Sequence, residues 1–215
     1  ISELAPTSTF YAEGRKVKVD QIDLSLSPPE TWRLCRQCHH LEVDGVGPPA
    51  PACPRCGDTF WPDAGQRRTL IRLRQVMATT EDRKSRIGDD ADQRAPAFYA
   101  KQMLVDIRPA QVREAFAVDD PDFPFGFEFV DKATFRELNF GERLYSGPSV
   151  RIAGVEFPRS GFTLCRRCGK VQRRMTADSG DDEADGKAAA RAHDLTCPAR
   201  GSDDPANLLG AAYLY

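Results

Sequence analysis

Two complete sets of four metal ligands constrain this chain more than any other feature of its sequence. The first set has the spacing C-x2-C, fourteen residues, C-x2-C, and the second has C-x2-C, twenty-four residues, H-x3-C. Structural zinc sites take four tetrahedral ligands of these types, either four cysteines or three cysteines and a histidine. The sequence therefore predicts two Zn²⁺ ions per chain, one bound by Cys35, Cys38, Cys53 and Cys56 and one by Cys165, Cys168, His193 and Cys197.

The ligand count also bears on what these sites can do. All seven cysteines are used, whereas a disulfide framework would leave one of them unpaired and a redox dithiol would need only one pair. Closed four-ligand zinc sites hold a fold together and leave no open position for catalysis. His39 and His40 lie beside the first set, either as surface histidines or as competing ligands.

Length and composition indicate one large domain or two small ones in a soluble chain. The 215 residues are 40% hydrophobic and 29% charged, and no apolar run reaches the roughly 18 residues of a membrane span. The first residues do not form a signal peptide, and paired C-x2-C cysteines favour a reducing, cytoplasmic location. Both ends resemble cuts, so we expect a piece of a longer polypeptide.

Net charge limits the ways in which the chain could bind nucleic acid. The formal charge is −2 with neutral thiols; seven thiolates add −7 and two zincs add +4, which brings the metal-bound chain near −5. Binding to DNA or RNA by charge alone is therefore disfavoured, and any contact must come from a local basic patch.

Hydrophobic alternation predicts a fold of the α+β class that is rich in β-structure. Period-2 patterns indicate strands at 10–26, with a turn at Glu13-Gly14, and again at 103–107 and 125–130. Residues 67–77 fit either a helix or a strand, and the strand is favoured. A further hairpin is expected at 150–157 around Ala153-Gly154. Short helices are expected at 110–117 and 187–193, a loop or short helix at 80–96, and a solvated loop at 178–187.

Three consecutive segments are expected within what is most simply one compact unit. Residues 1–64 hold the N-terminal hairpin and a four-cysteine zinc ribbon, 65–157 a β-rich middle region, and 158–215 the cysteine/histidine unit with its acidic loop. The two zinc units share an aromatic-x-Leu-Cys-Arg-x-Cys entry, which predicts a strand leading into each metal knuckle.

Basic residues cluster around the second ligand set. Arginines in the knuckles either contact phosphate or offset the negative charge of a zinc–thiolate centre. A second group, Arg67, Arg68, Arg72 and Arg74, either extends a basic face or lines the wet side of a strand. The stretch 159–174 contains no acid and is the candidate nucleic-acid contact, through Arg159, Arg166, Arg167, Lys170, Arg173 and Arg174.

No catalytic residue is predicted. The sequence has no G-x4-G-K-[ST] phosphate loop and no G-x-G-x-x-G dinucleotide motif, and the acidic run around Asp89 is explained by a solvated loop. The chain alone is therefore not expected to be an enzyme.

The order of short motifs resembles a known type of region. An N-terminal E-L-A-P hairpin is followed by W-R-x-C-x-x-C, C-P-R-C-G, F-G-F-E-F, L-C-R-x-C-G-K and H-D-x-x-C-P-A-R. This order is similar to the C-terminal zinc-binding region of large bacterial DEAD/DEAH-box (superfamily 2) helicases, related to the mitomycin-repair helicase and to anti-phage defence helicases. The resemblance implies a non-catalytic part of an ATP-dependent machine whose motor lies N-terminal to it or in a partner subunit.

Two functions are expected from these observations. The first is a structural zinc module of a bacterial helicase that assists nucleic-acid binding or strand separation. The alternative is a protein-interaction scaffold that docks a partner subunit of a DNA repair or phage-defence complex. A continuous basic face would favour the first, and an exposed apolar patch would favour the second.

Overall fold

A computed structural model of the chain describes residues 5–45, 47–80, 99–142, 148–158, 161–172, 193–202 and 204–215. Strands make up 48% of it and helices 6%, so the β-rich fold with two clusters of zinc-type ligands is confirmed. Among the described residues, helix is limited to short 3-10 turns, of which η2 (Ala64–Gln66), η3 (Pro109–Gln111) and η4 (Pro205–Asn207) each lead directly into a strand.

The largest sheet gathers strands from all three predicted segments. Its order is β4-β3-β5-β14-β10-β7, and β13 pairs with β14 beside this path. All of its pairs are antiparallel except β5 with β14. Its strands are β3 (Pro29–Leu34), β4 (Leu41–Val43), β5 (Arg67–Arg72), β7 (Tyr99–Asp106), β10 (Thr134–Glu142), β13 (Phe162–Cys165) and β14 (Leu208–Leu214).

Apolar side chains on both faces of the last strand, β14, explain why this sheet is covered on both faces. In β14, Leu209 and Tyr213 belong to one hydrophobic cluster, whereas Ala212 and Leu214 belong to another. Successive strand residues point to opposite faces, so each face has its own core. The core that contains Ala212 and Leu214 includes Ile152 and Phe157 of a hairpin, and the core that contains Leu209 and Tyr213 includes Ile22 and Val171.

The elements that cover these faces are short hairpins. A three-stranded sheet has the order β1-β2-β6, from β1 (Thr9–Ala12), β2 (Arg15–Ile22) and β6 (Val76–Thr79). A separate hairpin joins β11 (Ser149–Ile152) to β12 (Val155–Pro158). Both predicted turns are confirmed: Glu13 and Ala153 have φ of 49°, and each precedes a glycine with positive φ, as two-residue hairpin turns require.

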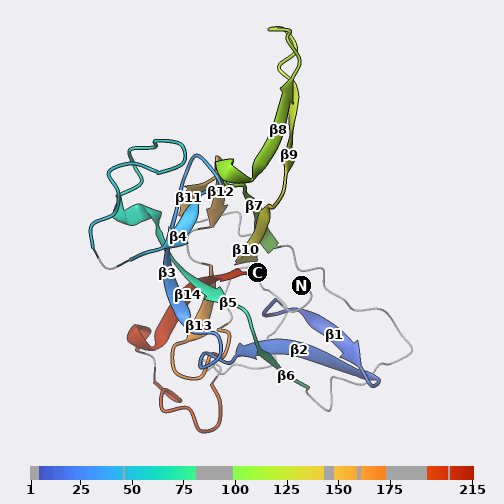
Figure 1. Cartoon of the computed structure of the whole chain (residues 1–215). Coiled ribbons are helices and arrows are strands. Elements are labelled where there is room, and N and C mark those ends of the chain that lie inside the picture. The colour runs from blue at the N-terminus through green and yellow to red at the C-terminus, as the bar shows by residue number, and fades with distance from the viewer. Residues whose placement is uncertain are drawn as a thin grey trace.

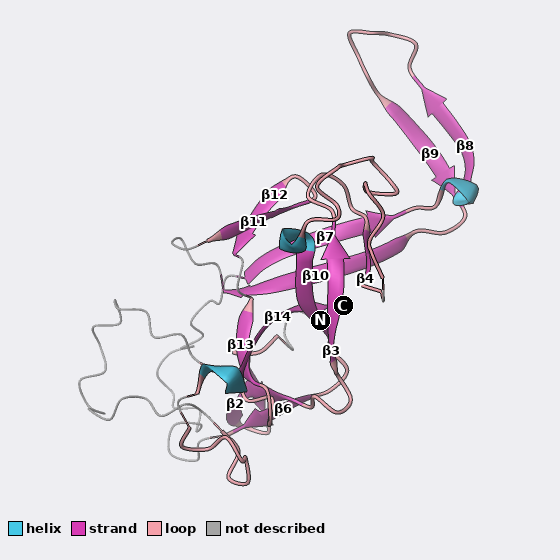
Figure 2. Cartoon of the chain, turned by 90° about the vertical axis from the view of Figure 1, so that its left-hand side faces the viewer, coloured by secondary structure: helices cyan, strands magenta, loops and turns pink. Residues whose placement is uncertain are grey.

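One hairpin stands apart from the rest of the molecule. β8 (Val112–Ala117) pairs only with β9 (Gly126–Val130) among the described strands. In Figure 1 the two strands rise away from the sheet, and the turned view in Figure 2 shows the same projection. The hairpin is connected to the sheet through β7 and β10 at its base.

Several local expectations need correction. The helix predicted at 110–117 is wrong, because the chain makes a 3-10 turn and then strand β8, whose Phe116 pairs with Phe127 across the hairpin. The strand predicted at 10–26 ends at Ile22, where Asp23 accepts hydrogen bonds from the Ser25 and Leu26 amides and forms a turn. The strand at 67–77 is divided into β5 and β6.

Other expectations agree with the structure or fall outside it. The strands predicted at 103–107, 125–130 and 150–157 are confirmed by β7, β9 and the β11–β12 hairpin. Three predicted segments lie outside the described residues except at residue 80 and His193. They are the loop or short helix at 80–96, the acidic loop at 178–187 and the helix at 187–193. Within the described part of the chain, no helix has the length and apolar character needed to cross a membrane.

Candidate metal centres

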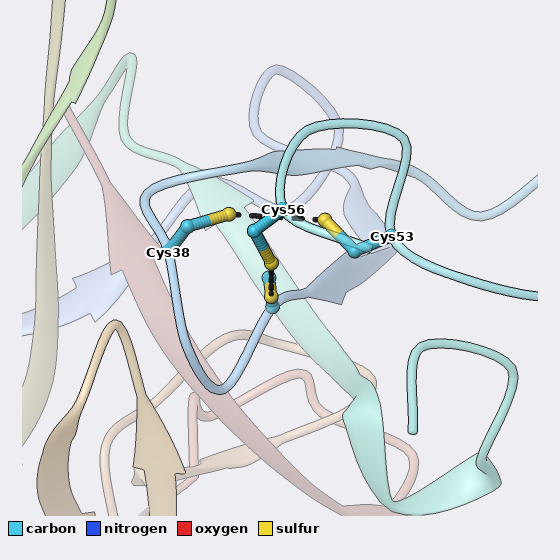
Figure 3. Close-up of side chains that lie close together, drawn as sticks. Cys38, Cys53 and Cys56 are labelled. Atoms are coloured by element: carbon cyan, nitrogen blue, oxygen red, sulfur yellow. Dashed lines mark hydrogen bonds between the residues drawn. The ribbon is translucent and has the colours of Figure 1, made fainter. Parts of the chain in front are cut away.

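The first predicted ligand set converges on one point. The Sγ atoms of Cys35, Cys38, Cys53 and Cys56 all lie within 4.8 Å of one another. Figure 3 shows Cys38, Cys53 and Cys56 directed toward one another from two facing loops. Cys35 and Cys53 are buried, whereas Cys56 lies at the surface.

The separations between these sulfurs match the edges of a metal tetrahedron. A zinc ion about 2.3 Å from two sulfurs at the tetrahedral angle separates them by about 3.8 Å. The Sγ atoms of Cys35 and Cys56 are 3.6 Å apart, and those of Cys38 and Cys53 are 3.7 Å apart. These distances exceed a disulfide bond by more than an ångström and a half, and the cysteines are free thiols.

The second ligand set also converges. Cys165 and Cys197 sulfurs are 3.8 Å apart, and His193 Nδ1 lies 3.5 Å from Cys197 Sγ and 4.0 Å from Cys168 Sγ. A sulfur and a nitrogen on one tetrahedral zinc are separated by about 3.6 Å. The prediction that His193 completes this set is therefore supported by geometry, with Nδ1 as the donor atom.

Backbone hydrogen bonds give the C-x2-C loops their shape. The amide of Cys35 donates to His40 O, that of Cys53 to Asp58 O, and that of Cys165 to Lys170 O. In each case the loop closes five residues after the cysteine. The amides of Gln37 and Arg167 also donate to the sulfurs of Cys35 and Cys165, which favours the thiolate form that a metal needs.

Each centre begins at the end of a strand in the main sheet. Cys35 follows β3 directly, and Cys165 is the last residue of β13. Leu34 and Leu164, which precede them, are fully buried. The shared aromatic-x-Leu-Cys motif thus places a strand and its buried leucine next to each metal knuckle, as predicted.

Neighbouring elements hold the first knuckle from two sides. The turn of the β11–β12 hairpin donates from Ala153 N to Cys35 O at 3.1 Å and from Gly154 N to Arg36 O at 2.8 Å. On the other side, His39 Nδ1 accepts from the amide of Val105 in β7. His39 is therefore engaged with the backbone, and the cluster of four sulfurs includes neither His39 nor His40.

A buried arginine holds the segments that precede and follow the second cysteine pair. The Arg33 guanidinium donates to Trp61 O at 2.7 Å, to Asp63 O at 2.9 Å and to Asp44 Oδ1 at 3.0 Å. Trp61 is itself fully buried and packs against Cys35 and Cys53. The loop that carries the second cysteine pair is thus tied to β3 by one side chain.

Strand β2 performs the corresponding role at the second centre. The buried Gln21 amide donates to Cys168 O at 2.7 Å and to Asp194 Oδ2 at 2.5 Å, next to ligand His193. Two backbone hydrogen bonds add to this contact: the amide of Ile22 donates to Gly169 O, and the amide of Val171 donates to Asp20 O. An isolated glutamine in a strand gives no sequence signal for this contact, and sequence reasoning missed it.

Burial and hydrogen bonding shift the pKa values of the thiols in different directions. Burial raises the pKa of Cys35 and of Cys168 to about 11, and it also raises the pKa of Cys38. At Cys56 burial acts in the same sense, but hydrogen bonds from the Asp58 amide and neighbouring thiols outweigh it and lower the pKa. Without a metal the thiols of Cys35, Cys38 and Cys168 stay protonated, so metal binding must release protons from them.

The predicted basic contact is only partly within the described residues. Arg159, Arg173 and Arg174 lie outside them. Arg166 and Arg167 are exposed beside the second centre, and Arg166 also donates to Leu208 O at 3.3 Å. Lys170 is largely buried and forms an ion pair with Asp20 at 2.6 Å.

Four of the other arginines noted in the sequence have acidic partners. Arg36 pairs with Asp58 at 3.0 Å and stacks on Phe60, with 3.5 Å between its guanidinium carbon and the ring centre. Arg55 pairs with Asp106 at 2.8 Å. Arg67 pairs with Asp44 and Arg72 with Glu30. These contacts give the arginines structural partners, which leaves fewer of them for a continuous basic face.

The fold and its centres thus define a strand-rich chain with two clusters that could each hold a metal ion. No protein-family model, curated protein or solved structure matches the chain. What the chain does must therefore be inferred from its own residues.

Proposed function

We propose that the chain is a structural zinc-binding module. The observation that carries this proposal is the presence of two complete four-ligand groups with tetrahedral spacing, each placed at the end of a strand in the same sheet. Each group supplies all four ligands of a zinc ion, so neither has a ligand position for substrate. Zinc would fix the positions of loops that have little hydrophobic core of their own.

Elemental analysis of the purified protein tests this proposal. Two zinc ions per chain are expected after purification in reducing buffer, and prolonged exposure to a strong chelator should remove both and increase protease sensitivity. A preparation that is fully folded with one zinc or none would contradict the proposal. A reducing cytoplasm is the compartment that suits such thiolate sites.

We further propose that the module belongs to a bacterial helicase and has no catalytic activity of its own. The support is the order of zinc and strand motifs, which resembles the C-terminal region of superfamily 2 helicases. The ATPase motor would lie in the same polypeptide or in a partner subunit. The full reading frame of the gene and its neighbours gives a direct test, because motor motifs should be encoded there.

Nucleic-acid binding through the second centre is part of this proposal. Arg166 and Arg167 are exposed on the knuckle, where a rigid metal loop would hold them toward phosphate. Replacing both with glutamate should weaken binding to a single-stranded or forked oligonucleotide and flatten its salt dependence by about two in slope. Arg151→Glu, an exposed charge change on β11, is the control. Identical titrations for all three proteins would contradict the contact.

A docking scaffold is the second candidate, and one observation favours it. The β8–β9 hairpin carries exposed phenylalanines, whereas Lys170, Arg67 and Arg72 of the expected basic face are paired with acids. Large exposed apolar groups on a soluble domain commonly mark a protein interface. The partner would be another subunit of a DNA repair or phage-defence complex.

A further inference from the structure

The projecting β8–β9 hairpin exposes an unusual number of aromatic side chains. Five phenylalanines along it are each between 49% and 59% exposed, although phenylalanine is among the residues most often buried. Among the described residues, none of the five belongs to a hydrophobic core cluster. They are Phe116, Phe123, Phe125, Phe127 and Phe129.

These rings are ordered by strand geometry into one face. Phe127 and Phe129 alternate along β9, and Phe116 is the cross-strand partner of Phe127. The ring centres of Phe116 and Phe127 are 5.3 Å apart, and Phe129 meets both rings edge-on at 5.6 to 6.0 Å. Phe123 and Phe125 continue the aromatic surface toward the tip, 6.0 Å apart.

Such a face is preorganised for binding. The rings already hold one another in place, so less side-chain entropy is lost when a partner covers them. Aromatic side chains also dominate the most important contacts of protein interfaces. A two-stranded hairpin gains no core of its own from this surface, because its rings remain half exposed.

The charge of the hairpin determines the kind of partner. Residues 112–131 contain six acidic residues and one basic residue. That base, Arg113, pairs with Asp131 at 2.7 Å. Phosphate chains and anionic lipid surfaces would be repelled, and so would a second copy of the same hairpin. The other acids are Glu114, Asp119, Asp120, Asp122 and Glu128.

We propose that the β8–β9 hairpin inserts its phenylalanine face into an apolar groove on a partner protein whose rim is rich in lysine and arginine. The aromatic rings supply most of the affinity, and the acidic residues of the strands and tip select a basic rim and speed the encounter. This inference rests on the docking-scaffold function proposed above and identifies both its surface and the chemistry of its partner.

Site-specific photocrosslinking in the cells that make the protein tests the surface. A benzophenone amino acid replaces Phe123, at the tip of the aromatic face, and in separate strains replaces Leu26 or Leu195, which are exposed elsewhere. A protein crosslinked from Phe123 and not from the other two positions is expected. Crosslinking to DNA or to the chain itself would overturn the proposal.

Binding of the purified crosslinked protein then tests the chemistry. Phe116→Ser with Phe127→Ser should weaken affinity by roughly tenfold or more, while Leu26→Ser leaves it unchanged. A triple variant retains all the aromatic rings and removes three acidic charges: Asp119→Asn, Asp120→Asn and Asp122→Asn. This variant should associate more slowly with the partner, and its association rate should depend less on salt. Zinc content and melting temperature of each variant must match the parent protein, because the hairpin makes no strand pairs outside itself among the described residues.

The outcomes separate this inference from the function on which it rests. A protein captured from Leu26 or Leu195 but not from Phe123 would leave a docking function standing and overturn the role of the hairpin. No protein from any position would overturn both. Binding that is unchanged by the phenylalanine variants, or unchanged by salt and by the aspartate variants, would also overturn the proposed partner chemistry.

Discussion

At the scale of single residues, the metal ligands should behave as two independent groups. Cys53→Ser removes a buried ligand of the first centre, and Cys197→Ser removes one of the second. Each variant should retain one zinc, since the two groups share no ligand. Zinc content measured together with limited proteolysis checks this expectation, with new cleavage confined to the altered unit. Two zincs in either variant would contradict the assigned ligands.

Arg33 offers a second residue-scale prediction because its environment differs from that of Arg67, although both contact Asp44. The Arg33 side chain is 5% exposed and bonds two backbone carbonyls, whereas that of Arg67 is 51% exposed. Arg33→Ala should lower the free energy of unfolding by about 3 kcal/mol, since buried partners lose their donor.

Arg67→Ala is the matched control for this experiment. An exposed ion pair contributes about 1 kcal/mol at most, so urea denaturation should show a small change. Arg33→Lys should give an intermediate loss, because an ammonium group cannot reproduce the planar donors of arginine. If Arg33→Ala and Arg67→Ala lowered the free energy of unfolding equally, burial of the Arg33 guanidinium would not contribute to stability.

At the scale of elements, Gly169 and Gly57 occupy equivalent positions in the two centres. Both follow the second cysteine of a pair, and their φ angles are +72° and +76°. A Cβ at Gly169 would clash with Ile22 O in β2, whereas a Cβ at Gly57 would have nothing within 4 Å. Gly57→Ala therefore measures backbone strain alone, and Gly169→Ala adds a steric clash.

The expected result is an asymmetric effect on metal retention. Gly57→Ala should cost about 1 kcal/mol, the usual penalty for a left-handed backbone with a side chain. Gly169→Ala should displace β2 and release the second zinc at a much lower chelator concentration. A competition assay with a coloured chelator measures this. Similar zinc retention in both variants would mean that β2 does not support the second centre.

Elements differ in how well the sequence predicts them. The grouping of the cysteines and the histidine into two clusters and the two hairpin turns follow from local chemistry, and both occur in the structure. The helix predicted at 110–117 failed because Phe127, which pairs with Phe116, lies outside the local window. The parallel pairing of β5 with β14 and the contact of Gln21 with Cys168 join residues far apart in sequence, and no local pattern specifies them.

At the scale of the whole molecule, two tyrosines at the end of the described chain make the free energy of unfolding depend on pH in the alkaline range. Burial raises the pKa of Tyr213 well above its usual value, and burial followed by the charge of Glu137 raises that of Tyr215 to about 12. The folded state therefore keeps protons that the unfolded state loses near pH 10. The stabilisation of the folded state by these two neutral tyrosines is fully present below pH 10, and it is lost as the pH rises toward 12.

Urea denaturation above pH 10 should reveal this loss. Each buried tyrosine reduces the free energy of unfolding by roughly 1.4 kcal/mol per pH unit in that window. Tyr213→Phe should make the pH dependence shallower. It should also stabilise the protein slightly at pH 8, because no hydrogen-bond partner for the buried Tyr213 hydroxyl occurs among the described residues. If Tyr213→Phe left the slope of the unfolding free energy against pH unchanged, the raised pKa of Tyr213 would be contradicted.

The position of the projecting hairpin has a consequence for how such a chain can change over generations. β7 and β10 pair directly from Asp106 opposite Thr134 to Tyr99 opposite Glu142, and the whole hairpin lies in the interval between Asp106 and Thr134. A tight turn across that interval would leave the sheet and both ligand clusters intact. Mutation and recombination can therefore lengthen, replace or delete this segment without passing through an unfolded protein, so descendants can change the exposed aromatic surface while inheriting the same scaffold.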